Sequence, residues 1–317
     1  MHKVDYEDQF KNLRHKSILI TGGAGKLANA FYASLKTNAP ETRVILTTKE
    51  SLDVESPASF AKYLEFKPDY ILHCAARVNA DYCETNFPEA KRNIVGGATN
   101  TLKFALECGA KILFPQSFLI HDGRTNPVDE STTPNPISNY GKLKLEAEEK
   151  VRQQNNSLVI RMGGFFGGGT YDRNFVGKFC RLISTMIKEG EQVIEIGNRI
   201  WQPTFTKDIA ANSLVLIALD KSGIYNMASH GQATFYDVAN FIVDKLELTN
   251  RIQIKKMQPD RAKHLDIALR PASINMVNSR LASEFVDFQR DWRVSLNEYL
   301  ESYEFNSAFP FSSQNLH

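Results

Sequence analysis

Long apolar runs alternate with segments of helical spacing through the first half of the chain. The runs that we predict to be strands are "KSILIT" (16–21), "RVILTT" (43–48), "PDYILHCAA" (68–76), "KILFPQS" (111–117) and "SLVIRMGG" (157–164). They are apolar at successive rather than alternate positions, which is typical of strands buried on both faces of a parallel sheet. The segments predicted to be helices are the one after the first glycine turn and 56–66, 87–110 and 137–155. This alternation indicates an α/β fold, a Rossmann-type doubly wound parallel sheet.

The alternation becomes irregular after about residue 165. A glycine-rich loop, "GGFFGGGTYDRNF" (163–175), is followed by further helices and short strands, up to a helix near 295–304. We therefore expect residues 1–164 to be mainly the Rossmann-type domain. Residues 165–317 are expected to be mainly a smaller lobe, interleaved so that some segments return to the first domain. The charged N-terminus, "MHKVDYEDQFKNLRHK", lacks an apolar core and is predicted to be a polar lead-in rather than a signal peptide.

The first strand is followed by a glycine turn, with the sequence Gly22-Gly23-Ala24-Gly25-Lys26-Leu27-Ala28. Its spacing, G-x-x-G-x-x-A, stands between a strand and a helix. Glycine permits a tight turn and the close approach of a pyrophosphate, which the N–H groups and positive dipole end of the helix stabilise. In this position the pattern indicates a dinucleotide cofactor; the alternative is a glycine turn without a ligand.

The end of the second strand bears on the choice of cofactor. Proteins that bind NAD usually place an acid here, on the free ribose 2′-hydroxyl. In this chain Thr47, Thr48 and Lys49 come first and Glu50 follows. Lys49 is placed to pair with a 2′-phosphate, which favours NADPH over NADH; the alternative is a lysine that points into solvent. Asp53, a few residues on, is expected at the edge of the adenine pocket.

Composition and charge restrict the class of protein. The 317 residues are 42% hydrophobic and 23% charged, with a formal net charge of +2. This is ordinary for a globular protein and indicates neither a nucleic acid nor a membrane partner. No apolar run approaches the roughly 20 residues that span a bilayer. The four cysteines form no CxxC pair and the histidines have no ligand spacing, so we expect no metal site and a reducing cytoplasm.

Ser117, Tyr140 and Lys144 are side chains suited to the reduction of a carbonyl group. Tyr140 and Lys144, in "YGKLK", lie one helical turn apart on the same face. Ser117 ends the fourth strand, at the carboxyl edge where such sheets bind ligands. Free tyrosine has a pKa of about 10, and a nearby ammonium would lower it enough for proton transfer near neutral pH. Ser117 would orient a carbonyl oxygen while a nicotinamide supplies hydride.

Taken together, the motifs resemble the extended short-chain dehydrogenase/reductase superfamily and, more narrowly, the dTDP-4-dehydrorhamnose reductase family. The segments that carry the resemblance, over residues 16–300, are "ITGGAGKLA", "LDV", "HCAARVNADYCE", "KRNIVG", "SFLIHDG", "PVDESTTPNPISNYGKLKLEAE", "RMGGFFGGGTYDRNFV", "QPTFTKDIA", "GIYNMASHGQATFYDVA" and "RPASINMVNSRL". The resemblance implies a nicotinamide cofactor, deoxysugar biosynthesis and a homodimer. It also implies a nucleotide-diphosphate sugar bound between the Rossmann domain and the C-terminal lobe. It assigns catalysis to Ser117, Tyr140 and Lys144.

The same match implies which residues hold each ligand. For the cofactor they are Gly22, Gly25, Lys26, Leu27, Lys49, Asp53, Val54, Ala75, Ala76 and Asn93, with Tyr140 and Lys144. For the substrate they are Phe118, His121, Asn174, Gln202 and Arg270. Arg270 suits a diphosphate because guanidinium binds phosphate oxygens bidentately; its alternative is a salt bridge. His121, on the loop after the catalytic strand, is either a substrate contact or an incidental polar residue.

The sugar side of the chain departs from the family. Where the family reads S-T-D-Y-V-F-D-G, this chain has "QSFLIHDG" (116–123). Phe118 and Leu119 thus replace an acid and a phenol, and we expect a more apolar pocket. Where the family reads R-T-S-W-V-Y-G, this chain has "RMGGFFG" (161–167). Gly164 replaces a tryptophan there, which predicts a wider pocket.

Three functions are compatible with these observations. The leading hypothesis is an NAD(P)H-dependent reductase of a nucleotide-linked 4-keto-6-deoxy sugar. A sugar-nucleotide 4-epimerase would use the same three residues with tightly bound NAD. A dehydratase is disfavoured because Phe118 and Leu119 stand where an acidic pair is usual. The alternative of another class is a non-catalytic NADP-binding subunit, like the regulatory β-subunit of methionine adenosyltransferase, which is in the same family.

Overall fold

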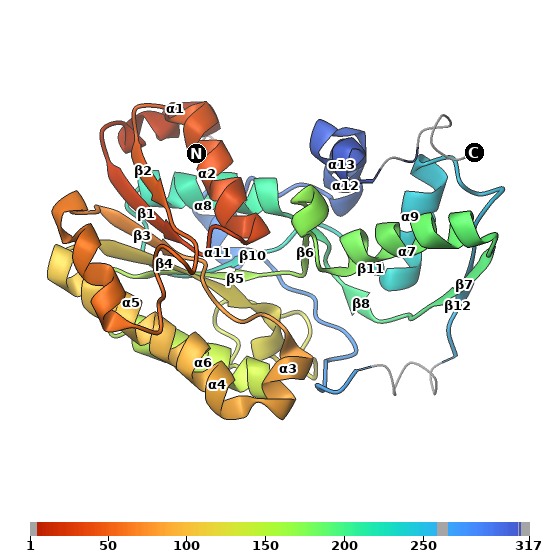
Figure 1. Ribbon diagram of the computed structural model, residues 1–317, viewed down its shortest axis with the longest axis horizontal. Coiled ribbons are helices and arrows are strands. Elements are labelled where there is room, and N and C mark those ends of the chain that lie inside the picture. Colours follow the sequence, from red (N-terminus) through yellow and green to blue (C-terminus); the bar gives the residue numbers. More distant parts are fainter. Residues whose placement is uncertain (1–4, 259–265, 310, 312–317) are drawn as a thin grey trace.

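A parallel sheet of six strands forms the centre of the molecule (Figure 1). The computed structural model describes residues 5–258, 266–309 and 311. The strands are, in spatial order, β10 (Gly223–Met227), β5 (Leu158–Met162), β4 (Lys111–Ser117), β3 (Tyr70–His73), β1 (Ser17–Thr21) and β2 (Arg43–Leu46). Each neighbouring pair is parallel. The predicted α/β fold is confirmed, and β10 joins the sheet from the second half of the chain.

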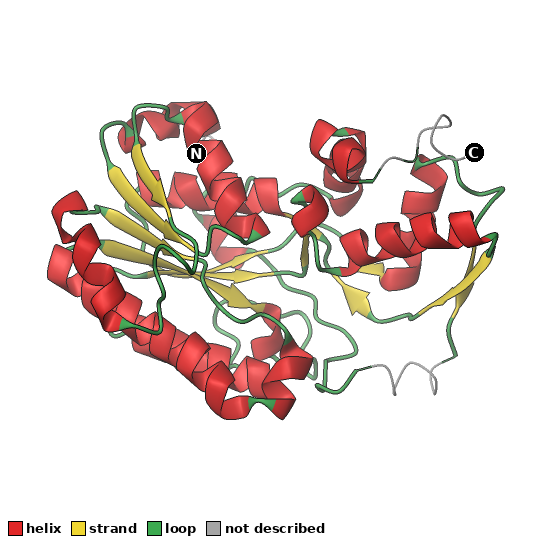
Figure 2. Cartoon of the chain, in the orientation of Figure 1, coloured by secondary structure: helices red, strands yellow, loops and turns green. Residues whose placement is uncertain are grey.

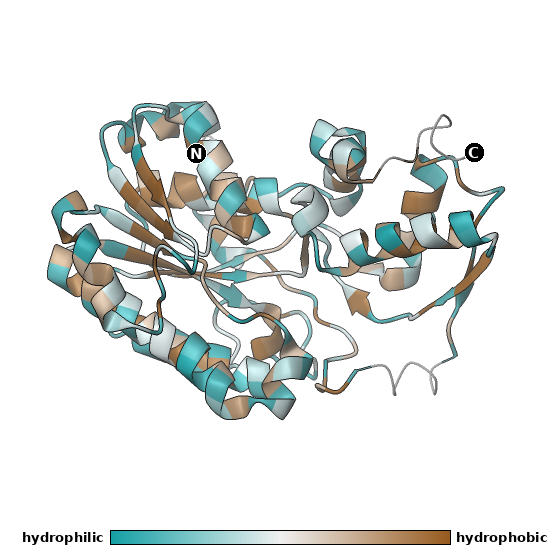
Figure 3. Cartoon of the chain, in the orientation of Figure 1, coloured by the Kyte–Doolittle hydropathy of each residue, from teal (hydrophilic) through white to brown (hydrophobic). Residues whose placement is uncertain are grey.

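Alternate residues of the buried strands pack into two separate cores, one on each face of the sheet. In β1, Ile18 and Ile20 lie in a core with helices α2 (Lys26–Asn38) and α8 (Thr206–Ala218). Leu19, between them, lies in the core formed with α5 (Gly97–Cys108) and α6 (Asn139–Val151). Burial on both faces explains why these strands are apolar at successive positions. Figure 2 shows helices on both faces of the sheet, and Figure 3 shows hydrophobic residues concentrated in its strands.

The other helices of the sheet domain differ in part from the prediction. They are α1 (Tyr6–Gln9), η1 (Phe10–Leu13), η2 (Pro57–Phe66), α3 (Ala80–Thr85), α4 (Phe87–Lys91), η3 (Arg92–Gly96), α5 (Gly97–Cys108), η4 (Phe118–Ile120), α6 (Asn139–Val151) and α11 (Ser279–Ser283). The segment η2 is a 3₁₀ helix. The single helix predicted over 87–110 is interrupted by a π-helical turn, η3, and ends as expected at Gly109. The N-terminal stretch is not only a polar lead-in, because Phe10 and Leu13 are buried in the core.

The C-terminal lobe has its own core. Its elements are β6 (Phe165–Phe166), η5 (Gly169–Tyr171), α7 (Phe175–Glu189), β7 (Val193–Ile196), β8 (Ile200–Trp201), β9 (Thr204–Phe205), β11 (Ala233–Thr234), α9 (Phe235–Lys245), β12 (Gln253–Lys256), α12 (Trp292–Glu301) and α13 (Tyr303–Ala308). Aromatic rings are central to this core: Phe166 stacks on Phe205 at 5.2 Å, and both contact Tyr299. In the described part of the chain, no helix is long and apolar enough to cross a membrane.

The order of the strands reverses beside β1. The chain goes from β1 to β2 on one side of it and then returns to β3 on the other side. In open parallel sheets, ligands bind outside the carboxyl ends of the strands at such a point. The glycine turn that follows β1 and the segment that follows β3 meet there.

Candidate active site

The glycine turn packs directly on the end of β3. Gly22 has a φ of 76°, and a Cβ on it would lie 2.7 Å from the backbone nitrogen of Ala75. Only glycine permits this approach. Gly25 is the N-cap of α2, and its N–H donates to the carbonyl of Gly22 at 2.8 Å. The helix therefore begins at the crevice, an arrangement that fits the pyrophosphate of a dinucleotide. Leu27 is buried in the core, so its backbone rather than its side chain is available to a ligand.

Asn93 joins the segments that follow β2 and β3. Its Oδ1 accepts from the backbone N–H of Arg77 at 2.6 Å, and its Nδ2 donates to Glu55 Oε1 at 2.9 Å. Asp53 closes the turn before Glu55 by accepting from the Glu55 backbone N–H at 3.0 Å. Lys49 is exposed at the end of β2. The other cofactor candidates on this edge are the buried Val54 and the half-buried Ala75 and Ala76.

The side chain of Lys26 lies between the two lobes. Its Nζ pairs with Asp172 Oδ1 at 2.7 Å, and both side chains are buried. Burial lowers the pKa of Lys26, and the Asp172 carboxylate opposes that shift. The backbone of Lys26 belongs to the glycine turn, but its charge is balanced by a residue of the other lobe.

Tyr140 and Ser117 come together because α6 packs closely on the segment that follows β4. A Cβ on Gly141 would lie 2.3 Å from the carbonyl oxygen of Leu119, so the glycine of "YGKLK" permits this approach. Ser138 caps α6 by accepting from the Gly141 N–H at 3.2 Å. The Ser117 hydroxyl accepts from the Leu119 N–H at 3.2 Å and also interacts with Tyr140.

The pKa of Tyr140 is shifted in the direction opposite to our expectation. Burial raises it, and the opposing effect comes from the hydrogen bond with Ser117 rather than from Lys144. Lys144 instead donates to the carbonyl of Pro115 at 2.6 Å and lies 4.0 Å from the centroid of the Phe114 ring. Burial lowers the pKa of Lys144 to about 7, against the effect of the Glu148 carboxylate. Tyr140 is therefore protonated at neutral pH, as a proton donor must be.

A buried ion pair joins α6 to β5. Arg161 of β5 donates to Glu148 of α6, with Nη2 2.6 Å from Oε1 and Nε 3.3 Å from Oε2. Gln116 of β4 donates to Glu148 Oε2 at 2.8 Å and to the carbonyl of Lys144 at 2.9 Å. This network holds the turn of α6 that carries Lys144. His121 is buried beside the pair, where desolvation and the charge of Arg161 lower its pKa to about 4.

Gly164 does not widen the pocket, so that expectation is wrong. A Cβ on Gly164 would lie 2.6 Å from Trp201 Cε3, because the indole ring occupies the space. Trp201 is 5% exposed and packs on Phe235 at a centroid distance of 5.0 Å. The hollow that remains has no room for a water-sized sphere, and it is lined by Phe118, Gly163, Gly164, Trp201, Gln202, Ile274 and Met276. Most of this lining is apolar, as expected from Phe118.

We expect Gly164→Ala to destabilise the protein by about 1–3 kcal/mol, because its methyl group would overlap the Trp201 ring and force the core to shift. Urea unfolding measures this free energy. Gly197→Ala is the matched control, since a Cβ there would meet no heavy atom within 4 Å. Equal stability of the two variants would show that Trp201 does not fill the space beside Gly164.

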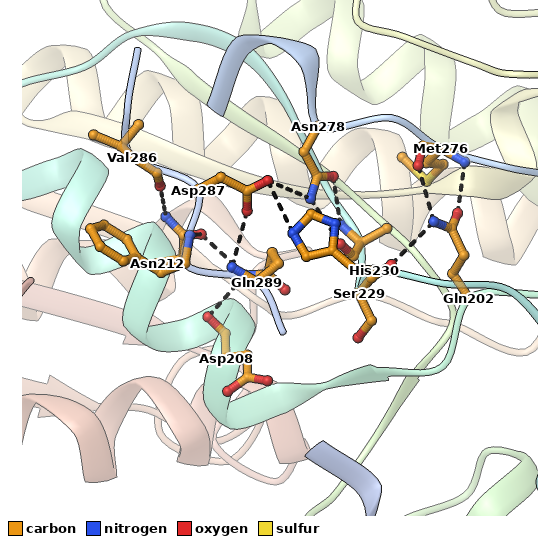
Figure 4. Close-up of polar contacts among 12 residues, drawn as sticks. Gln202, Asp208, Asn212, Ser229, His230, Met276, Asn278, Val286, Asp287 and Gln289 are labelled. Carbon is orange, nitrogen blue, oxygen red and sulfur yellow. Dashed lines mark hydrogen bonds and ion pairs between the residues drawn. The ribbon is translucent and has the colours of Figure 1, made fainter. Parts of the chain in front are cut away.

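Gln202 uses its amide group within the protein (Figure 4). Its Nε2 donates to the carbonyls of Ser229 at 3.2 Å and Met276 at 3.0 Å, and its Oε1 accepts from the Met276 N–H at 2.6 Å. Gln202 thus ties three segments into one wall of the hollow. Its contribution to a substrate site is to shape it.

Two other substrate candidates also have protein partners. Asn174 donates to the carbonyl of Phe165 at 2.7 Å and is the N-cap residue of α7. Arg270 forms ion pairs with Asp81 at 3.1 Å and Asp266 at 2.6 Å. The salt-bridge alternative for Arg270 is therefore the one observed, and Asp81 connects it to α3 of the sheet domain.

Five residues that shape the site were not among the candidates predicted from the sequence: Gln116, Glu148, Arg161, Asp172 and Trp201. Some of them carried a local signal. Glu148 lies one turn beyond Lys144 on the same helix face, and Arg161 interrupts an apolar strand. Two opposite charges in positions predicted to be buried indicate a pair. Asp172 and Trp201 carried no comparable signal.

The profile of the RmlD substrate binding domain family matches residues 16–305. Among solved structures, a dTDP-4-dehydrorhamnose reductase from Clostridium acetobutylicum is similar to this chain with a TM-score of 0.82 and 27% identity. The similarity covers 90% of this chain and 98% of that chain. It therefore extends over the sheet domain and the C-terminal lobe alike.

Two curated relatives differ in function from each other. Methionine adenosyltransferase 2 subunit beta from Bos taurus is 27% identical over 310 residues, which are 91% of this chain and 88% of that protein. A dTDP-4-keto-6-deoxy-D-glucose reductase from Streptomyces niveus is 27% identical over 227 residues, which are 70% of this chain and 75% of that protein. Because both relatives are 27% identical to this chain, sequence identity does not distinguish the two functions. The distinction has to come from the residues of the site.

Proposed function

The chain belongs to the RmlD substrate binding domain family, and on this premise we propose that it is an NAD(P)H-dependent reductase of a nucleotide-linked 4-keto-6-deoxy sugar. The observation that carries the proposal is that Ser117, at the carboxyl end of β4, interacts with Tyr140 of α6, and that Lys144 lies one helical turn further along the same helix. The substrate class is supported by the reductase from Streptomyces niveus and by the similar reductase structure.

We propose a role for each of the three residues. A bound nicotinamide would supply hydride to the carbonyl carbon of the sugar. Tyr140, kept protonated by burial, gives its proton to the carbonyl oxygen, which completes the alcohol. The Ser117 hydroxyl donates a hydrogen bond to the same oxygen. Lys144, in its ammonium form, stabilises the phenolate left on Tyr140.

NADPH is the proposed cofactor. Lys49, Arg77 and Arg92 all act electrostatically on the half-buried Glu89, so three cations lie near one another at the edge next to β2. Such an edge favours a 2′-phosphate over a free hydroxyl. NADH is the alternative.

Native mass spectrometry tests the function. The purified protein is examined alone and with NADPH, NADH and a panel of dTDP-, UDP-, GDP- and CDP-sugars. We expect an empty protein that takes up NADPH and one nucleotide sugar, and NADPH oxidation with the 4-keto form of that sugar. Release of bound NAD on denaturation would instead identify an epimerase. The same spectra show whether the protein is the expected dimer.

A second candidate function is a non-catalytic NADP-binding subunit. The methionine adenosyltransferase subunit covers more of this chain than the reductase from Streptomyces niveus does, 91% against 70%. The hollow beside Trp201 also has no room for a water-sized sphere, whereas ordinary ligand pockets have volumes of ~300–1,000 Å³. Binding of NADPH without any nucleotide sugar would favour this function.

A further inference from the structure

The first residue of α2 reaches into the other lobe. Lys26 follows the last glycine of the turn, yet its Nζ donates to Asp172 Oδ1 at 2.7 Å and to the carbonyl of Phe165 at 3.0 Å. The ammonium also lies 4.7 Å from the centroid of the Phe165 ring. Lys26 is 8% exposed and Asp172 is 0% exposed. A charge buried to this degree is retained only with a full set of partners.

Asp172 organises the loop that runs from Phe165 to Asn174. Its Oδ1 accepts from the Asn174 N–H at 2.9 Å, and its Oδ2 accepts from the Gly167 N–H at 3.2 Å. Its backbone carbonyl accepts from Arg181 of α7. The carboxylate is thus the centre of the loop, and Lys26 is its counter-charge.

The backbone of the loop also lies close to Lys26. A Cβ on Gly168 would lie 2.5 Å from the Cβ of Lys26. At its other side, the Gly169 N–H donates to the Tyr299 hydroxyl at 3.0 Å, which fixes the loop to the core of the C-terminal lobe. The loop therefore has one anchor in each lobe.

This loop continues directly into the wall of the hollow. Gly163 and Gly164 line the hollow and immediately precede Phe165. Phe165 pairs with Thr204 in the short β6–β9 sheet. Thr204 comes two residues after Gln202, which also lines the hollow. A shift of the loop relative to α2 would consequently move this wall of the hollow, which Phe118, the residue after Ser117, also lines.

We propose that Lys26 is a positioning residue: its ion pair with Asp172 fixes the loop 165–174 on the cofactor turn and so sets the shape of the nucleotide-sugar site. The side chain does not serve as a ligand of the cofactor pyrophosphate. The proposal rests on the proposed function, which requires a nucleotide-sugar site beside this loop.

The test compares Lys26→Met, Asp172→Asn and the double variant. NADPH affinity is measured by fluorescence titration, and the nucleotide sugar by binding and by KM. We expect NADPH affinity to change less than about twofold in all three, and KM for the sugar to rise about tenfold or more in each single variant. The double variant should be no worse than either single one, because both changes break the same pair. Lys26→Arg keeps the cation and should behave like the wild type.

Lys36→Met is the matched control. It removes a positive charge from the same helix, but at an exposed position, and should leave both affinities unchanged. If Lys26→Met weakens NADPH binding about tenfold while Asp172→Asn does not, Lys26 is a phosphate ligand and the proposal is overturned.

Limited proteolysis reports on the same pair without substrate. Arg173 is exposed and lies next to Asp172. We expect trypsin to cleave after Arg173 about tenfold faster in Lys26→Met and in Asp172→Asn than in wild type and Lys36→Met. Unchanged cleavage in both variants would show that the ion pair does not hold the loop and would overturn the proposal. A wild-type protein that binds no nucleotide sugar would refute the proposed function instead, while cleavage would still show whether the pair holds the loop.

Discussion

Tyr140→Phe is expected to lower turnover by about 10²–10⁴-fold while leaving NADPH affinity within about twofold of wild type. The Tyr140 ring is buried and packs in the core beneath α6, and phenylalanine preserves that packing. What is lost is the hydroxyl that interacts with Ser117 and that is the proposed proton donor. Steady-state reduction of the nucleotide sugar, with NADPH titrated separately, measures the two effects.

Tyr63→Phe is the control for this variant. It also removes one tyrosine hydroxyl. That hydroxyl donates to the carbonyl of Ser51 at 3.1 Å, and neither residue belongs to the proposed catalytic set. Its turnover should equal that of the wild type. A Tyr140→Phe protein that turns over at the wild-type rate would remove Tyr140 from the role of acid.

Glu148→Gln is expected to destabilise the protein by about 3–5 kcal/mol, because it leaves the buried guanidinium of Arg161 without its counter-charge. Glutamine has nearly the shape of glutamate, so the loss reports on charge rather than on a cavity. The change also weakens the network through which Gln116 holds the carbonyl of Lys144. Urea unfolding gives the free energy.

The neighbouring Glu149 provides the control, since it is exposed on the same helix. Glu149→Gln should alter stability by less than about 0.5 kcal/mol. Replacing both partners, as Glu148→Gln with Arg161→Met, should recover much of the loss, because no unpaired charge then stays buried. A Glu148→Gln protein as stable as its control would show that the ion pair does not stabilise the fold.

Contacts between distant segments of the chain could not be predicted from the sequence. Arg270 matched a family position that suits a diphosphate, but it forms ion pairs with Asp81 and Asp266. Gly164 predicted a wider pocket, but Trp201 fills the space. Gly164 is small and Arg270 is cationic, as the predictions assumed, but the contacts that each residue makes were not predicted. Trp201 and Asp81 could not be predicted from the local pattern, because they belong to other segments of the chain.

The sequence by itself determined the parallel sheet, the glycine turn and the positions of Ser117, Tyr140 and Lys144. These features depend on short-range rules: apolar runs for buried strands, glycine spacing for a turn, and a separation of four residues for one helix face. Only the tertiary structure decided what surrounds them. Lys26 and Asp172 are 146 residues apart, and their pairing depends on how the two lobes pack. No sequence period encodes that packing, because it is set by the fit of side chains from distant segments.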